Sequence, residues 1–190
     1  IGDVTSDGKN DVVVGTGYDG YKLLLYAQNA EGGLSIVSTC STAGSYTYPG
    51  FYAYSRPDTV AIGDINNDGK NEVVVGNFER NIEVFVQNGA GGLASSATYT
   101  TTNSHQIRIA DLNHDGLSDV VGIGWSGNSV DLFLQYVDGT LNPPIKYTVE
   151  YAGWNDMEVG DINNDGLTDI IVRSGQGLTP MIGILTQKAE

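Results

Sequence analysis

Residues 62–75 read IGDINNDGKNEVVV, an aspartate-rich loop followed at once by a run of valines. The pattern recurs without gaps in three further segments, which are IGDVTSDGKNDVVV at 1–14, IADLNHDGLSDVVG at 109–122 and VGDINNDGLTDIIV at 159–172. Successive copies lie about 50 residues apart, a period typical of the blades of a β-propeller. The chain is therefore expected to consist of four structural repeats.

Each repeat is predicted to form four short strands. In the second repeat these strands cover 59–63, 73–76, 82–87 and 93–100, and the glycine-rich turn QNGAGGL joins the last two. The valine run is apolar on both faces, as in strands that are covered on both sides. We therefore expect an all-β fold with about four blades of four antiparallel strands. They form one region over residues 1–190, with repeats starting near residues 1, 59, 105 and 155.

The charge of the chain indicates which partners to expect. It carries 23 acidic against 9 basic residues, a formal net charge of -14. Binding to phosphate backbones needs clustered Lys and Arg, so nucleic acid is not an expected partner. No apolar stretch approaches the length of a membrane span, and no membrane insertion is expected.

The repeated loop has the residue types that bind calcium. Its pattern is Asp, apolar, Asn or Thr, any residue, Asp, Gly, two further residues, and Asp or Glu. Ca²⁺ takes six to eight hard oxygen ligands, and acids at alternate positions of a tight loop can converge on one point. The sixth-position glycine permits the sharp turn, because it adopts a positive φ at no steric cost.

Four calcium sites are therefore predicted, each with five protein ligands. The predicted ligands are Asp3, Thr5, Asp7, the carbonyl of Lys9 and Asp11 in the first loop; Asp64, Asn66, Asp68, the carbonyl of Lys70 and Glu72 in the second; Asp111, Asn113, Asp115, the carbonyl of Leu117 and Asp119 in the third; and Asp161, Asn163, Asp165, the carbonyl of Leu167 and Asp169 in the fourth.

The loop pattern has two other possible interpretations, a metal-free turn and an EF-hand. Asp and Asn side chains also close turns by bonding to the backbone, without any metal. Four loops with acids at the same offsets favour the metal, because three carboxylates crowded together repel one another without a cation. An EF-hand would need a glutamate at position twelve and flanking helices, whereas here the last acid lies at position nine and a strand follows.

The loop, the valine-rich strand and the GGL or GTL turn together resemble FG-GAP/VCBS repeats. That family supplies the blades of integrin α-subunit propellers and of many secreted bacterial and fungal proteins. The resemblance implies a ring usually of seven blades, with calcium loops on its lower face and ligand binding on its upper face. Thr5 departs from the family pattern and weakens the first site, and Glu72 needs more room than Asp.

We also expect the chain to be a fragment, incomplete at both ends. It begins within a first strand and ends where the glycine-rich turn of the fourth repeat should begin. Unpaired strand edges are normally covered. Further blades, from the same parent protein or from another copy, are therefore expected partners.

Aromatic residues gather in the connections that the resemblance assigns to the upper face. An insertion, GSYTYPGFYAYSR at 44–56, supplies five of them. Tyr and Trp present rigid amphipathic area and are favoured at binding surfaces. The predicted ligand-binding residues are Tyr48, Phe51, Tyr52, Trp125 and Trp154. The alternative is that these rings only pack against their own blade.

These observations predict a calcium-stabilised recognition or adhesion module, extracellular or on a cell surface, that binds a glycan or a protein through its upper-face loops. The chain has two histidines and no Ser-His-Asp order or HExxH motif, so we do not expect an enzyme. Two alternatives stay open. One is a propeller, catalytic or not, within a secreted polysaccharide-degrading enzyme, and the other is a structural component of a surface layer or pilus.

Overall fold

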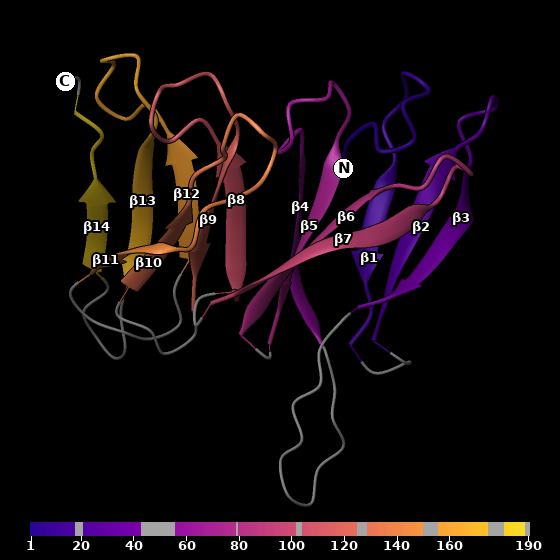
Figure 1. Cartoon of the computed structure of the whole chain (residues 1–190), viewed down its shortest axis with the longest axis horizontal. Coiled ribbons are helices and arrows are strands. Elements are labelled where there is room, and N and C mark those ends of the chain that lie inside the picture. Colours follow the sequence, from indigo (N-terminus) through magenta and orange to yellow (C-terminus); the bar gives the residue numbers. More distant parts are fainter. Residues whose placement is uncertain are drawn as a thin grey trace, which may run out of the picture. The chain divides into compact units, whose positions relative to one another are not determined.

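The computed structural model describes residues 1–17, 21–42, 56–78, 80–101, 104–124, 129–149, 156–174 and 181–188, and it confirms the all-β prediction. In these residues the strands form four antiparallel sheets (Figure 1). The chain divides into two compact units. The first comprises Ile1–Asp64 and Gly69–Thr100, and the second comprises Ile65–Asp68 and Thr101–Glu190.

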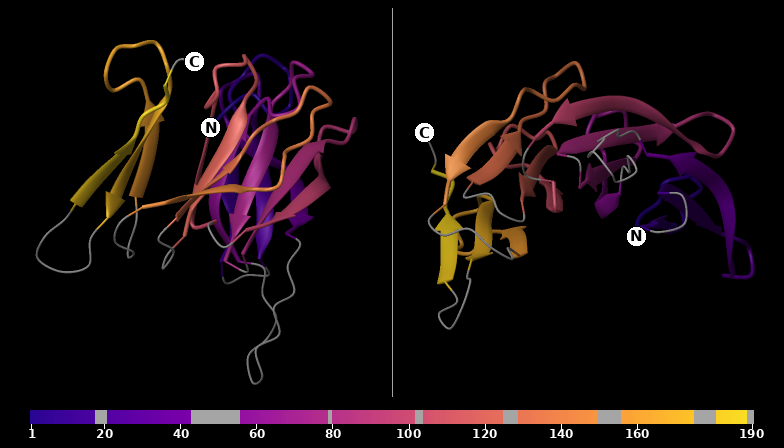
Figure 2. Two further views of the ribbon diagram at one scale, coloured as in Figure 1. Left: turned by 60° about the vertical axis from the view of Figure 1, so that its left-hand side comes forward. Right: turned by 90° about the horizontal axis from the view of Figure 1, so that it is seen from below.

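The first unit holds two sheets, in the orders β1-β2-β3 and β4-β5-β6-β7. Their strands are β1 Val12–Gly15, β2 Lys22–Gln28, β3 Leu34–Ser41, β4 Pro57–Gly63, β5 Glu72–Asn77, β6 Asn81–Gln87 and β7 Leu93–Thr100. The strands predicted for the second repeat match β4 to β7 to within a few residues. The sheets lie side by side, with β1 against β4 and β3 against β7 (Figure 2).

The core of the first unit lies between these two sheets. Leu23 and Leu25 of β2 pack with Val73, Val75 and Phe85 of the neighbouring sheet, and all five are at most 1% exposed. Because β5 is buried along its whole length, its valines are covered on both faces, as the valine run predicted.

The second unit holds the other two sheets, in the orders β11-β10-β9-β8 and β12-β13-β14. Their strands are β8 Gln106–Ala110, β9 Asp119–Ile123, β10 Ser129–Phe133, β11 Ile145–Thr148, β12 Asp156–Gly160, β13 Asp169–Ser174 and β14 Met181–Leu185. An apolar core between them includes Val121, Val130, Met157 and Val172, each at most 2% exposed. Within the described residues, no helix is long and apolar enough to cross a membrane.

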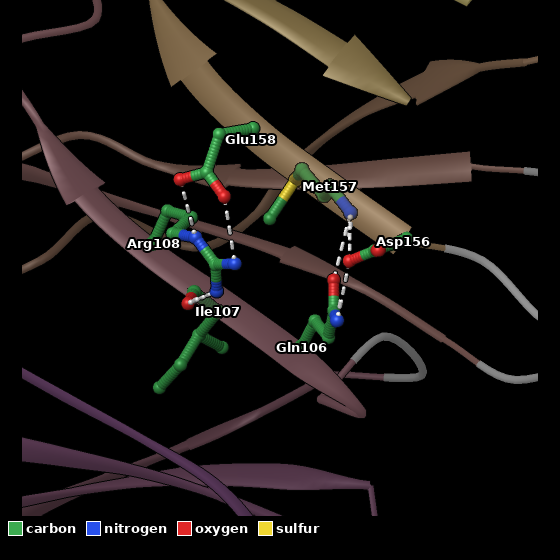
Figure 3. A network of polar contacts seen from close by, with 6 residues as sticks. All are labelled: Gln106, Ile107, Arg108, Asp156, Met157 and Glu158. Carbon is green, nitrogen blue, oxygen red and sulfur yellow. Dashed lines mark hydrogen bonds and ion pairs between the residues drawn. The ribbon is translucent and has the colours of Figure 1, made fainter. Parts of the chain in front are cut away.

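Polar side chains also join the two sheets of the second unit, between β8 and β12 (Figure 3). The Gln106 amide donates to Asp156 Oδ1 at 2.7 Å and accepts from the Met157 backbone N–H at 2.7 Å. Arg108 forms a bidentate pair with Glu158, with both N···O distances at 3.0 Å. The Gln106 side chain thus satisfies a backbone donor on the edge of β12 that has no strand partner on that side in the described sheet.

Candidate metal-binding loops

The four aspartate-rich loops share one backbone conformation. The sixth-position glycine has a φ between +83° and +85° in every loop, as predicted; these are Gly8, Gly69, Gly116 and Gly166. The fourth position is also left-handed, with φ between +58° and +62°, in Ser6, Asn67, His114 and Asn164. Asn and His adopt this conformation more readily than most other side chains. The two asparagines are a signal for this geometry that the sequence prediction did not use.

In the third loop the polar side chains at the first, third and fifth positions accept hydrogen bonds from the loop backbone. Asp111 Oδ1 accepts from the N–H of Asp115 at 3.2 Å, and Asp111 Oδ2 from the N–H of Gly116 at 2.9 Å. Asn113 Oδ1 accepts from the same Asp115 N–H at 3.0 Å, and Asp115 Oδ1 from the Leu117 N–H at 2.8 Å. These bonds hold the oxygens at fixed places around the turn.

The other loops repeat this arrangement. The bond from the glycine amide to the first aspartate measures 2.9 Å in all four loops; its acceptors are Asp3, Asp64, Asp111 and Asp161. The third-position Asn66 and Asn163 accept from the fifth-position amide at 2.9 Å and 2.8 Å. The seventh-position Lys9 and Leu167 donate their amides to Asp7 and Asp165, each at 2.9 Å.

The ninth-position acid lies at the base of each loop, where it is at most 2% exposed; these residues are Asp11, Glu72, Asp119 and Asp169. Asp119 Oδ2 accepts from the N–H of Leu112 at 2.9 Å, and Oδ1 accepts from the N–H of Gln135 at 2.8 Å. Asp169 makes the same two bonds, with Ile162 and Gln187. This acid therefore ties the start of the loop to the end of the third strand, a role that the sequence prediction missed.

In the third loop, burial and neighbouring carboxylates both act on the pKa of Asp119. Burial raises the pKa of Asp119 above its ordinary value, the backbone bonds from Gln135 and Leu112 oppose this rise, and the negative charges of Asp115 and Asp111 add to it. A positive charge among these three carboxylates would relieve their repulsion.

The donor set fits a hard cation only if neutral oxygens take part. Among the described residues, no group of three or more Asp, Glu, His or Cys side chains is arranged to hold a metal ion by itself. A cation in these loops would therefore also need neutral oxygens, such as the third-position side chain. In the first loop, Thr5 Oγ1 is buried and has no hydrogen-bond partner, as expected of an oxygen that a cation would satisfy. Carboxylate oxygens that accept one amide bond keep a second lone pair.

The five predicted ligand-binding residues, Tyr48, Phe51, Tyr52, Trp125 and Trp154, lie outside the described residues. At the end of the β4–β5 hairpin away from the loop, Phe78 follows β5 and is 55% exposed. Arg56 lies over its ring, 4.6 Å from the centroid, and pairs with Asp58 at 2.8 Å. An exposed aromatic ring with a stacked cation is thus present at the end that the sequence analysis assigned to ligand binding.

Comparisons with known proteins agree with the repeat pattern. A family model described as FG-GAP-like repeat matches the chain three times, over residues 3–75, 64–122 and 111–172. No curated protein matches the chain. A Photorhabdus luminescens Tc holotoxin pore structure, carrying a mutation in TccC3, is similar with a TM-score of 0.54 and 18% identity. The similarity covers 95% of this chain but 8% of that one, and it concerns the fold alone.

Proposed function

Because the chain belongs to the FG-GAP-like repeat family, we propose that it is a calcium-stabilised recognition module of an extracellular or cell-surface protein. The family match and the four sheets together make the chain a propeller-like repeat module. The observation that carries the proposal is the recurrence of one loop geometry, with acids at the same three positions, in all four repeats.

Each loop has one buried acid and two outer acids, an arrangement in which a bound cation could stabilise the hairpin. The ninth-position acid is buried and fixes the loop to its sheet through backbone bonds. The first and fifth acids lie further out, and Asp115 and Asp165 are exposed. Calcium, when bound, would supply a divalent charge that offsets the repulsion among these acids. The loop residues themselves orient the oxygens through amide bonds.

Recognition is proposed for the opposite end of the sheets. Loops held at the end of a rigid scaffold are where binding residues usually lie. Phe78 and Arg56 support this assignment, because a half-exposed ring under a guanidinium suits contact with a sugar face or with a protein side chain. Tyr48, Phe51, Tyr52, Trp125 and Trp154 remain the proposed ligand-binding residues from the sequence.

Further blades are also proposed partners, either of the same parent protein or of another copy. Ile182 and Ile184 of β14 are 73% and 49% exposed. At the matching positions of the other repeats, the apolar residues are at most 7% exposed; they are Leu23 and Leu25, Ile82 and Val84, and Val130 and Leu132. In the described sheets Leu23 and Leu25 pack on a neighbouring sheet, which supports the same arrangement for β14.

Two experiments test the proposal. Isothermal titration calorimetry with CaCl₂ should detect binding to the purified chain and not to a variant with Asp7, Asp68, Asp115 and Asp165 all replaced by Asn. A glycan array and a pull-down should then find a ligand whose binding falls in Phe51→Ala/Tyr52→Ala. Tyr136→Ala is the matched control, because this tyrosine is 51% exposed but lies in a turn at the loop end of its sheet. Equal losses in both variants would contradict the upper-face assignment.

A further inference from the structure

The first loop is held by side chains of the next blade. Asn71 Nδ2 donates to the carbonyl oxygen of Asp3 at 2.8 Å. The Gln87 side-chain amide donates to the carbonyl of Val4 and to Ser6 Oγ, the latter at 2.7 Å. Asn71 is the eighth residue of the second loop, directly before β5, and Gln87 ends β6, so both belong to the second repeat, whereas the first loop precedes β1 in the first repeat.

These contacts lie at or next to Thr5 and Ser6, two positions at which the first loop differs from the second and fourth loops. Ser6 has a φ of +58°, and serine adopts this conformation less readily than the asparagines at the same position in the second and fourth loops. The third-position residue is Thr5, whose single hydroxyl replaces the amide oxygen present in the other loops. The bond from Gln87 to Ser6 Oγ fixes this residue, and the bonds to Asp3 and Val4 fix the two residues at the loop entrance.

A comparable contact occurs at the second loop, within the second unit. The turn between β10 and β11 brings Gly139 against Asn66, the third-position residue of that loop. A Cβ atom on Gly139 would lie 3.0 Å from the carbonyl oxygen of Asn66. At two loops, therefore, residues from the following repeat lie against the backbone of the preceding loop.

We propose that Asn71 and Gln87 are positioning residues for the first metal loop, so that the cation site of one blade is completed by the next. This inference rests on the proposed calcium binding. The two residues touch no predicted ligand oxygen on a side chain; they act through the backbone at Asp3 and Val4 and through Ser6. Because linkage is reciprocal, a cation in the first loop also strengthens the contact between the two sheets.

The test compares two variants with one matched control. Gln87→Leu and Asn71→Ala remove the contacts, while Gln28→Leu changes the position of the first repeat that matches Gln87 and keeps the backbone amide. Calcium affinity at one site should fall about fivefold in Asn71→Ala, as expected for the loss of one hydrogen bond, and by more in Gln87→Leu, which loses two. The control should bind as the wild-type chain does.

A double-variant experiment assigns the effect to the first loop. In an Asp7→Asn background, which removes that site, Gln87→Leu should no longer change calcium affinity. A second readout needs no metal: in chelator, the backbone amides of residues 5–9 should exchange hydrogen faster in Gln87→Leu than in Gln28→Leu. An effect that persists in the Asp7→Asn background, or exchange rates equal to those of the control, would overturn the inference. A wild-type chain that binds no calcium would instead overturn the proposed function.

Discussion

At the scale of single residues, the loops and turns depend on left-handed positions, and the sequence meets this demand unevenly. Asn67, His114 and Asn164 are residue types that adopt the left-handed conformation relatively often, whereas Ser6 occupies the fourth loop position at some cost. Gly32, Gly91 and Gly139 occupy the same position of the glycine-rich turn in the first three repeats, and their φ angles lie between +80° and +81°. A Cβ atom on Gly32 or Gly91 would meet no atom within 4 Å, whereas one on Gly139 would meet Asn66. Substitutions at these positions can therefore distinguish backbone strain from steric contact.

We predict that Gly139→Ala destabilises the chain more than Gly32→Ala. Both changes place a Cβ on a left-handed residue, which costs about 1 kcal/mol. At Gly32 the Cβ meets no atom within 4 Å, but at Gly139 it lies 3.0 Å from the Asn66 carbonyl and 3.1 Å from the Asn66 Cβ. Urea unfolding monitored by fluorescence should give the free-energy difference, and equal values for the two variants would contradict the contact.

At the scale of one element, the loop and its hairpin are joined through the ninth-position acid. We predict that Asp119→Asn lowers the free energy of unfolding by about 2–3 kcal/mol, because the new amide group would face a backbone N–H donor in a buried place. Asp138→Asn is the control, since Asp138 is exposed and bonds only within its own turn to Thr140. Chemical denaturation in chelator measures the free energy of unfolding of both variants. If Asp119→Asn leaves this free energy unchanged, the hydrogen bonds of Asp119 are dispensable.

The polar link between β8 and β12 has a pH dependence that can be stated from its charges. Hydrogen bonding to Arg108 lowers the pKa of Glu158, and hydrogen bonding to Gln106 lowers the pKa of Asp156. Carboxylates with lowered pKa stabilise the fold above their ordinary pKa values and lose this contribution as the pH falls through the lowered ones.

We therefore predict that Glu158→Gln reduces the loss of stability on acidification. The size is about 1 kcal/mol or less, because Glu158 is largely exposed and solvent screens the pair. Unfolding free energies measured at about pH 6 and about pH 3 should differ less in the variant than in the wild-type chain. A variant with the same pH dependence as the wild type would exclude this pair as a source of it.

At the scale of the whole molecule, calcium should act on all four repeats together. If all loops bind, each site at a free calcium concentration of about 100 times its Kd adds about 2.7 kcal/mol to the stability of the folded chain. Thermal unfolding should therefore shift upward in calcium relative to chelator, with a smaller shift in magnesium. Coincident melting curves in calcium and in chelator would contradict calcium stabilisation.

The same melts can rank the sites. Asp68→Ala and Asp165→Ala should reduce the calcium-dependent shift more than Asp7→Ala, because Thr5 makes the first site weaker from the start. The chelator curves of the three variants provide the control for effects that do not involve the metal. A larger loss for Asp7→Ala would indicate that support from the next blade outweighs the weaker ligand.

The sequence by itself determined the repeats, the strands of the second repeat and the positive φ of the loop glycines. These depend on contacts between near neighbours, such as the bond from Gly69 to Asp64 and the pairing of β4 with β5. Strong local signals, an Asp-rich turn with glycine and a valine run that prefers to be buried, leave few alternatives over such short distances.

Only the tertiary structure decided which residues support the loops across blades. Asn71 and Asp3 are 68 residues apart, and Gln87 and Val4 are 83 apart, so no local pattern relates them. The same holds for Gln106 and Arg108, which reach residues of β12. The burial of the ninth-position acids was equally unpredictable, because Asp119 meets the Gln135 amide only once the third strand pairs beside it. Such contacts form only after the sheets have assembled, when side chains distant in sequence are brought within hydrogen-bond range.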